Sequence, residues 1–201
     1  ASDVYKRQVE DGIFPSTYRV KWDIVGEPKV SILIPNKDHT EDLEKCLHSI
    51  WTKTEWEHFE VIVVENNSTD PATFAYYKKA QQRYDGLRVV TYPKKGFNFS
   101  GINNFGRKYA TGEYLLLLNN DVEVRSGEWL TELLRQCAHP GGAAVCGAML
   151  WYPDETIQHA GVITGLGGYA GHSHKYKKAG GSGYLFRTAT VQIAAETLRM
   201  D

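Results

Sequence analysis

A series of short apolar segments that alternate with longer amphipathic ones constrains the fold most. Segments such as KVSILIP and FEVIVVE are rich in β-branched residues and apolar on both faces, which is typical of strands in a parallel sheet covered by helices. The stretch EDLEKCLHSIW repeats apolar residues with helical period, so it predicts a helix between two of these strands. The alternation predicts an α/β fold with a mainly parallel, Rossmann-like sheet flanked by helices. The expected strands are 29–35, 59–65, 87–92, 113–118 and 143–150.

Short polar residues indicate where the helices begin. Asp70, followed by Pro71, predicts one helix start, and Ser100 and Ser126 predict two others, because such side chains cap the free N–H groups of a first turn. After residue 150 the regular pattern gives way to a segment rich in glycine and aromatic residues. This segment, 151–192, predicts an irregular, antiparallel C-terminal part.

The chain of 201 residues is long enough for one domain with a sizeable core. The pattern predicts an α/β domain over residues 29–150, preceded by an N-terminal extension, 1–28, and followed by the start of another region, 151–201. Residues 1–8, ASDVYKRQ, resemble translated sequencing-adapter sequence and are interpreted as a non-native artefact.

Charge and cysteine content exclude several classes of partner. With 23 basic and 24 acidic residues the formal net charge is -1, so no global field favours nucleic acid, and an anion must be bound locally. Cys46, Cys137 and Cys146 have no CxxC spacing and no secretory segment precedes them, which favours free thiols in the cytoplasm. No apolar run is long enough to span a bilayer.

The first four predicted strands lead into hydrogen-bonding side chains. Because the carboxyl ends of parallel strands meet at one edge of a sheet, these side chains are expected to surround a ligand site. Neither GxGxxG nor GxxxxGK[ST] occurs, so a dinucleotide or P-loop site is not supported. The residues concerned are Pro35, Asn36 and Lys37; Glu65, Asn67 and Ser68; Asn98; and Asn119, Asn120 and Asp121.

Two carboxylates at these strand ends predict the chemistry of the ligand. Mg or Mn needs only one or two protein carboxylates when substrate phosphates complete its shell, and Asp121 can supply one. Glu65 can accept hydrogen bonds from a ribose hydroxyl or a base N–H. The natural ligand is then a nucleotide diphosphate with a divalent cation. The alternatives are a solvated turn aspartate at 121 and a turn carboxylate at 65.

Four ordered motifs carry a family resemblance. KVSILIPNKDHTEDLEKCLHSI, VIVVENNSTD, GFNFSGINNFGRKYATGEY and LLLLNNDVEV resemble the family 2 glycosyltransferases of GT-A fold, in particular bacterial enzymes that build O-antigen and other surface polysaccharides. The resemblance covers residues 18–192.

The resemblance implies roles for particular residues. Pro35, Asn36 and Lys37 would line the nucleotide pocket, and Glu65 stands where the family usually has an aspartate that contacts the base or ribose. The sequence NND, residues 119–121, corresponds to the family's DxD motif, with Asp121 as the metal ligand and Asn119 in place of the first acid. Bordering the sugar-phosphate would be Asn98, Asn103 and Asn104.

The resemblance also implies an activity: inverting, metal-assisted transfer of a sugar from a nucleotide-diphosphate donor to a growing surface glycan or lipid-linked saccharide. The enzyme is expected in the cytoplasm, with peripheral contact to the inner face of the cell membrane. The family's general base follows a stretch matching Val191 and Gln192, where this sequence diverges, so the chain is interpreted as C-terminally truncated and lacking its base. The alternative is a noncatalytic nucleotide-sugar-binding module or an inactive donor-binding fragment.

Two histidine-containing features allow other interpretations. His172 and His174 form an HxH motif, with His159 upstream, but the spacing provides no convincing third zinc ligand. The run HKYKK, residues 174–178, is interpreted as a solvated loop, with contact to an anionic lipid as the alternative.

Overall fold

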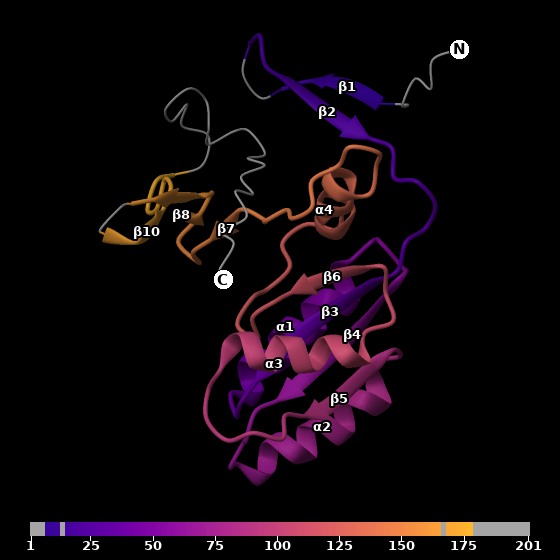
Figure 1. Ribbon diagram of the computed structural model, residues 1–201, viewed down its shortest axis with the longest axis vertical. Helices are drawn as coiled ribbons and strands as arrows, with labels where there is room; N and C mark the ends of the chain where they lie inside the picture. Colours follow the sequence, from indigo (N-terminus) through magenta and orange to yellow (C-terminus); the bar gives the residue numbers. More distant parts are fainter. Residues whose placement is uncertain (1–6, 13–14, 166–167, 179–201) are drawn as a thin grey trace. The chain divides into compact units, whose positions relative to one another are not determined.

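A computed structural model describes residues 7–12, 15–165 and 168–178 (Figure 1). The chain divides into two compact units. One consists of residues 25–131, and the other combines the residues up to 24 with those from 132 onward.

The unit of residues 25–131 is built on a four-stranded parallel sheet. The strand order is β5-β4-β3-β6, so the chain adds strands to one side of β3 and then returns to place β6 on its other side. This topology confirms the predicted α/β class with a parallel sheet. The strands are β3 (Val30–Asn36), β4 (Phe59–Glu65), β5 (Leu87–Thr91) and β6 (Tyr114–Leu117).

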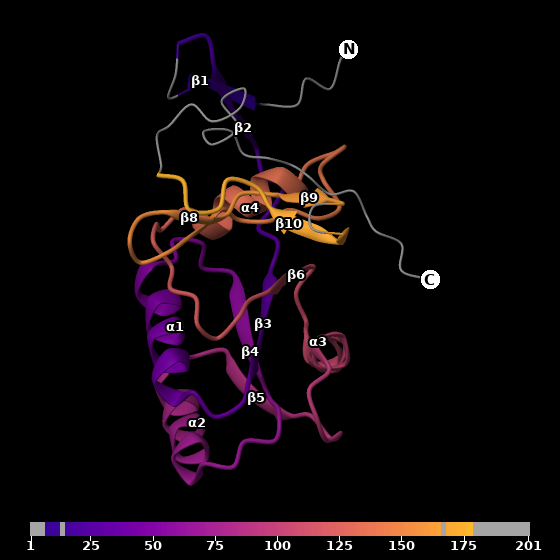
Figure 2. The same ribbon diagram turned by 90° about the vertical axis from the view of Figure 1, so that its left-hand side faces the viewer.

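Helices cover both faces of this sheet. Helices α1 (Thr40–Lys53) and α2 (Pro71–Arg83) lie on one face, and α3 (Phe99–Gly106) lies on the other (Figure 2). A 3-10 turn, η1 (Arg107–Tyr109), follows α3. The central strands β3 and β4 are almost fully buried because each is covered on two sides, which explains their continuous apolar sequence.

Two of the helix starts in this unit were predicted, one correctly. Asp70 caps α2 by accepting a hydrogen bond from the backbone N–H of Ala72, and Pro71 is the first helical residue. Ser100 does not cap α3. Instead, Asn98 accepts from the N–H of Gly101, at 2.8 Å, and the helix begins before Ser100.

Strand β6 differs from the fully buried strand that the run of leucines predicts. It lies at the edge of the four-stranded sheet, and its side chains alternate between half-buried and exposed. Leu115 and Leu117 are 43% and 53% exposed. One face of β6 is half-buried and the other is exposed, and only one neighbouring strand pairs with it in the described sheet.

The amino-terminal ends of the strands are fastened by Glu60, which is 5% exposed. Its carboxylate accepts hydrogen bonds from Ser31 Oγ, at 2.7 Å, and from the backbone N–H and the hydroxyl of Thr111, at 2.7 and 2.9 Å. Lys29 Nζ and an Arg88 guanidinium nitrogen lie 3.3 and 2.6 Å from its other oxygen. Glu60 therefore connects segments preceding or beginning all four strands.

The other unit contains short antiparallel pairs, as predicted for the C-terminal part. Its pairs are β1 (Arg7–Asp11) with β2 (Tyr18–Trp22), β7 (Leu150–Trp151) with β8 (Ile157–His159), and β9 (Val162–Thr164) with β10 (Ala170–His172). Arg7 and Gln8, which the sequence marks as artefact, are thus the first residues of β1.

Two sequence predictions around α4 (Trp129–Cys137) are wrong. Ser126 does not cap this helix, which begins three residues later, although the Ser126 carbonyl accepts from the N–H of Trp129. The strand expected at 143–150 is absent up to Leu150. Val145 is 56% exposed, and the surrounding alanines and glycines offer little side chain to bury, so the segment gains little from pairing. Among the described residues no helix is long and apolar enough to cross a membrane.

Candidate functional site

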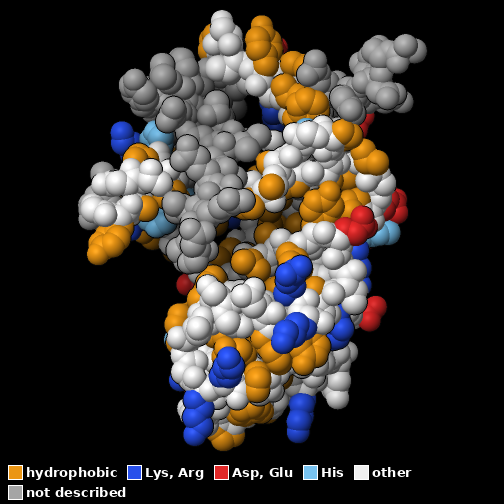
Figure 3. All heavy atoms as spheres, in the orientation of Figure 1, with side chains coloured by type: hydrophobic (Ala, Val, Ile, Leu, Met, Phe, Trp, Pro, Cys, Tyr) orange, Lys and Arg blue, Asp and Glu red, His pale blue; other side chains and the backbone are white. Residues whose placement is uncertain are grey.

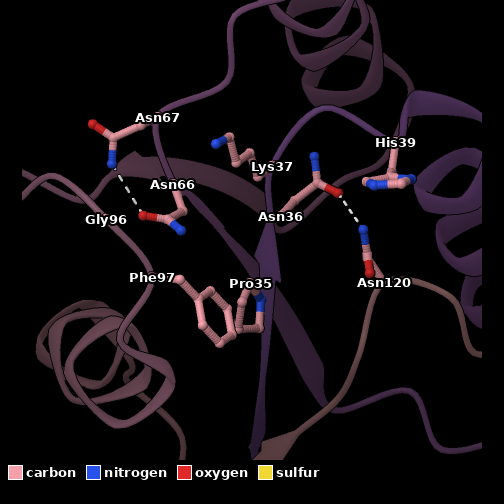
Figure 4. Close-up of a pocket in the computed structure, with 9 residues that line it drawn as sticks. All are labelled: Pro35, Asn36, Lys37, His39, Asn66, Asn67, Gly96, Phe97 and Asn120. Carbon is pink, nitrogen blue, oxygen red and sulfur yellow. Dashed lines mark hydrogen bonds between the residues drawn. The ribbon is translucent and has the colours of Figure 1, made fainter.

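A pocket of about 270 Å³ opens at the carboxyl ends of β3 and β4. It lies beside the point where the strand order reverses, between β3 and β6, which is where open α/β sheets bind ligands. Five of the predicted site residues line it: Pro35, Asn36, Lys37, Asn67 and Asn120 (Figure 4). The other lining residues are His39, Asn66, Gly96 and Phe97.

Asn36 is the structural centre of the pocket wall. Its side-chain nitrogen donates to the hydroxyl of Tyr77 and to the carbonyl of Asp38, each at 2.8 Å. Its side-chain oxygen accepts from the amide nitrogen of Asn120, at 2.6 Å (Figure 4). Asn36 is 2% exposed, so it positions Asn120 and the loop after β3 more than it offers groups to a ligand.

The loop after β3 turns sharply through two left-handed residues, Asp38 and His39, with φ of 52° and 46°. The turn places the Asp38 carboxylate against the loop after β4, where it accepts from the backbone N–H groups of Thr69 and Asp70, at 2.8 and 3.0 Å. These hydrogen bonds, that from Asp70 first, lower the pKa of Asp38. The ionised Asp38 side chain thus joins the loop after β3 to the loop after β4.

Glu65 lies beneath the loop after β4 and does not line the pocket. It is 1% exposed, and its Oε1 accepts from the backbone N–H of Ser68. Ser68 in turn accepts from the N–H of Asp38, at 2.8 Å, through its hydroxyl. The second oxygen of Glu65, Oε2, is buried without a hydrogen-bond partner among the described residues. Glu65 and Ser68 therefore support the pocket wall.

Asn67 joins two of the loops that form the pocket. Its backbone is left-handed, with φ of 59°, and its amide nitrogen donates to the carbonyl of Lys94, at 2.9 Å. The same nitrogen donates to the side-chain oxygen of Asn66, at 3.0 Å (Figure 4). The loops after β4 and β5 are thereby held together on the side where Phe97 lines the pocket.

The three asparagines of α3 do not line the pocket. Asn98 is exposed and caps the helix. Asn103 is 6% exposed and donates to the carbonyl of Phe99, at 2.9 Å, while its side-chain oxygen is buried without a described partner. Asn104 is exposed on the helix surface. Their structural functions in this unit are capping and packing.

Asn119 and Asp121, the two ends of the NND segment, are both exposed. The carbonyl of Asn119 contacts the buried thiol of Cys46, at 3.8 Å. Burial and the nearby negative charge of Asp121 raise the pKa of Cys46 to about 12, so this thiol stays neutral and has no nucleophilic character. Cys46, Cys137 and Cys146 are free thiols.

The oxygen-bearing side chains near Asp121 fit a divalent cation whose coordination shell is completed mainly by the phosphates of a bound nucleotide and by water. Over the described ranges, no group of three His, Cys, Asp or Glu side chains is arranged to hold a metal ion. Asp121 is an exposed carboxylate, and the neighbouring Asn120 uses its amide nitrogen on Asn36, which leaves an amide oxygen directed elsewhere. One carboxylate with amide oxygens suits Mg or Mn, whose shell phosphate and water complete.

The histidines of the antiparallel region do not form a zinc site with three protein ligands. His159 Nδ1 lies 2.8 Å from His172 Nδ1, so one ring donates to the other. Burial, followed by the charge of His172, lowers the pKa of His159. His174 instead contacts the hydroxyl of Ser173. The lowered pKa favours the neutral form of the His159 imidazole.

Four lining residues were not among the predicted site residues. Asn66 and Phe97 lie in the polar stretches after two strands, so they carried the same signal as Asn67. Gly96 has a φ of 86°, which suits glycine and turns the chain toward α3. His39 reaches the pocket because of the left-handed turn at Asp38 and His39. Neither residue is glycine, so the sequence does not reveal this turn.

The sheet order and the position of the pocket define an α/β protein of the GT-A class. The mannosyltransferase PcManGT from Pyrobaculum calidifontis, in complex with GDP-Man and Mn2+, has a similar fold, with a TM-score of 0.55 and 20% sequence identity over 67% of this chain and 40% of that one. The chain belongs to glycosyl transferase family 2, whose model matches residues 31–196. This membership confirms the resemblance inferred from the four motifs.

Relatives in this family include proteins of bacterial glycan synthesis. The O-antigen biosynthesis protein RfbC of Myxococcus xanthus is 45% identical over 158 residues, which is 79% of this chain and 12% of that protein. The GalNAc(5)-diNAcBac-PP-undecaprenol beta-1,3-glucosyltransferase of Campylobacter jejuni is 31% identical over 123 residues, 61% of this chain and 38% of that enzyme. The chain therefore spans a small part of the length of these relatives.

Proposed function

We propose that the pocket binds the nucleotide-diphosphate sugar donor of a glycosyltransferase. The observation that carries this proposal is the cavity at the β3/β6 switch point, lined by amide side chains from three loops in a family 2 chain. Amides supply both donors and acceptors for a base and a ribose, and Lys37 adds a positive charge for a diphosphate. The exposed ring of Phe97 offers a flat apolar surface to the same ligand.

The predicted site residues divide into two groups in this proposal. Direct contacts come from the residues that line the cavity, namely Pro35, Lys37, Asn67 and Asn120, together with the rim residues Asn119 and Asp121. Support comes from Asn36, Glu65 and Ser68, whose polar groups are used within the protein. Asn98 caps α3 next to the loop that bears Phe97, Asn103 donates to the carbonyl of Phe99 within the helix, and Asn104 is exposed on its surface.

Asp121 is the residue that would hold a divalent cation, with help from amide oxygens of Asn119 or Asn120. When bound, such a cation would neutralise the charge of the departing diphosphate. The protein groups then act by position: Lys37 and the asparagines fix the donor, and the hydrogen bond between Asn36 and Asn120 holds the segment before Asp121 in place.

The whole protein is proposed to transfer the sugar with inversion to a growing surface glycan or lipid-linked saccharide in bacteria. Two relatives support the pathway: one is named for O-antigen biosynthesis and another for a substrate linked to undecaprenol. Free cysteines agree with work in the cytoplasm, at the inner face of the membrane. The sugar transferred is proposed to be a hexose or a deoxyhexose.

A second candidate is a noncatalytic nucleotide-sugar-binding module. The observation that favours it concerns the carboxylates nearest the pocket wall: Asp38 accepts from two backbone N–H groups and Glu65 from a third. Neither is available to take a proton from an acceptor hydroxyl. Single-turnover assays on the full-length protein separate the two candidates, because a module binds donor and releases no transferred sugar.

The proposed donor site is tested by calorimetry with uridine, thymidine and guanosine diphosphates in the presence of Mn2+. At least one nucleotide is expected to bind, and Glu65→Ala is expected to weaken every nucleotide that binds by a similar factor, about 5-fold to 10-fold, because it releases the loop at Ser68. Glu65→Gln keeps an acceptor and is the matched control. Loss of one nucleotide only would instead assign Glu65 to base recognition.

Tyr77 is expected to affect the same binding through Asn36. Tyr77→Phe removes the hydroxyl that accepts from Asn36, so the Asn36–Asn120 pair loses its anchor and nucleotide affinity should fall about 5-fold, roughly 1 kcal/mol. The control is Tyr76→Phe on the same helix, because the Tyr76 hydroxyl is buried without a described partner. Equal affinities of the two variants, measured by calorimetry, would contradict the positioning role.

A further inference from the structure

Positive charge is concentrated in one part of an otherwise balanced chain. Residues 78–108 contain eight lysines and arginines and a single acid, Asp85, whereas the whole chain has a formal net charge of -1. The segment runs from the second half of α2 through β5 and α3 to η1. Three of these cations are on α2, which covers the other face, but Lys and Arg side chains also lie on the face of residues 25–131 that carries α3 (Figure 3).

Four of these cations flank α3 and are available to an external partner, while the exposed Lys78, Lys79 and Arg83 belong to α2 on the other face of the sheet. Arg88 is not among them, because it pairs with Glu60 and the carbonyl of Tyr109. In contrast, the side chains of Lys94, Lys95, Arg107 and Lys108 are exposed, and no ion pair to them occurs in the described part of the chain. Two lie in the loop before α3 and two in η1 after it.

Exposed aromatic rings accompany both pairs of cations. Phe97 and Phe99 are 77% and 44% exposed beside Lys94 and Lys95, and Tyr109 is 40% exposed directly after Lys108. The ring centroids of Phe97 and Phe99 are 6.4 Å apart, so the two rings form one apolar projection. The four cations and three rings together are called the α3 patch.

We propose that the α3 patch docks on the surface of an anionic lipid bilayer. Acidic headgroups attract lysine and arginine near the surface, and aromatic rings favour the interface between headgroups and acyl chains. The apolar face of α3 packs on the sheet, so the groups that meet the lipid are the cations and rings at the two ends of the helix. The combination of unpaired cations with exposed rings fits a lipid interface better than a wholly polar partner.

The patch adjoins the pocket, which gives docking a consequence. Gly96 and Phe97 line the pocket, and Phe97 also belongs to the patch. Docking would thus hold the pocket at the lipid surface. This inference does not depend on the nature of the ligand in the pocket, because lipid binding is measured without nucleotide.

Vesicle flotation of the full chain tests the proposal. The protein is expected to bind phosphatidylcholine vesicles that contain 30% phosphatidylglycerol and to leave pure phosphatidylcholine vesicles unbound, with binding lost at high salt. The variant Arg107→Gln/Lys108→Gln should lower the partition coefficient by about 10-fold to 30-fold, and Lys94→Gln/Lys95→Gln by a similar factor. Phe99→Ala should lower it about 3-fold or more.

The matched control removes the same charge from the other basic run. Lys177→Gln/Lys178→Gln, in the HKYKK segment, should bind vesicles as the unaltered protein does. A loss in this control equal to that in the α3 variants would overturn the assignment, and so would equal binding to neutral vesicles. Single-stranded RNA that displaces the protein from vesicles at similar concentration would assign the patch to nucleic acid instead. Circular dichroism verifies that each variant is folded.

Discussion

Replacing Asp121 with alanine is expected to raise the dissociation constant for a nucleotide diphosphate in Mn2+ by about 100-fold, and to remove its dependence on the metal. The reason is the donor set: Asp121 is the exposed carboxylate of the NND segment, where an asparagine replaces the first acid of the DxD pattern. With one protein carboxylate, no second acid compensates for its loss. Calorimetric titration with and without Mn2+ measures both effects.

The neighbouring Glu123 provides the control for this experiment. Glu123→Gln removes an equal charge from an exposed side chain two residues away and should leave the affinity within about 2-fold of the original, because an exposed charge that does not touch the cation interacts with it only weakly in water. Unchanged metal-dependent binding by Asp121→Ala would show that the cation is held elsewhere. Equal losses in both variants would indicate a general electrostatic effect and not a metal ligand.

The substitution Glu60→Gln is expected to destabilise the protein by roughly 2 to 3 kcal/mol at pH 7. Burial alone would raise the pKa of Glu60, but the hydrogen bonds from Ser31, Thr111 and Lys29 outweigh it and lower the pKa from 4.5 to about 2. The folded state thus favours the ionised carboxylate. Its stabilising contribution is fully present above pH 4.5 and is lost as the pH falls from about 4.5 toward 2.

Urea unfolding at several pH values measures this contribution. The difference in unfolding free energy between the unaltered protein and Glu60→Gln should be largest near neutral pH and should shrink below pH 4.5. Glu113→Gln, at an exposed position near the same end of the sheet, is the control and should change stability by less than about 0.5 kcal/mol. A pH-independent difference for Glu60→Gln would exclude ionisation as the cause.

The bounds of an element could be predicted from sequence where its own residues show which faces are buried or where a capping residue begins it. Strand β4 begins and ends at the predicted residues because both of its faces are covered, and α2 begins where Asp70 caps it. Other features depend on distant packing. The leucines of β6 do not reveal that the strand has one paired edge, and residues 143–149 are apolar without the side-chain volume that would secure a strand.

For the candidate site, sequence indicated the edge of the sheet at which the pocket opens but not the direction of each side chain. Five predicted residues line the pocket because they follow directly from the strand ends. Glu65 ends β4 as predicted, but it turns toward Ser68 beneath the loop, a hydrogen bond that sequence spacing does not reveal. His39 enters the pocket only through the left-handed turn at Asp38, and Asn98 rather than Ser100 caps α3 because the loop turns earlier.

The stability of the parallel sheet and the shape of its pocket depend on residues at opposite ends of the strands. Glu60 fastens the strands at their amino-terminal ends, whereas the pocket is assembled at their carboxyl ends by loop residues such as Asn36 and Asn67. Under the proposed function, a lineage of such chains would be able to exchange loop residues and acquire a new donor preference with limited loss of stability, provided that Glu60 and its partners remain. Directed evolution of sugar specificity should accordingly tolerate libraries in these loops and penalise changes around Glu60.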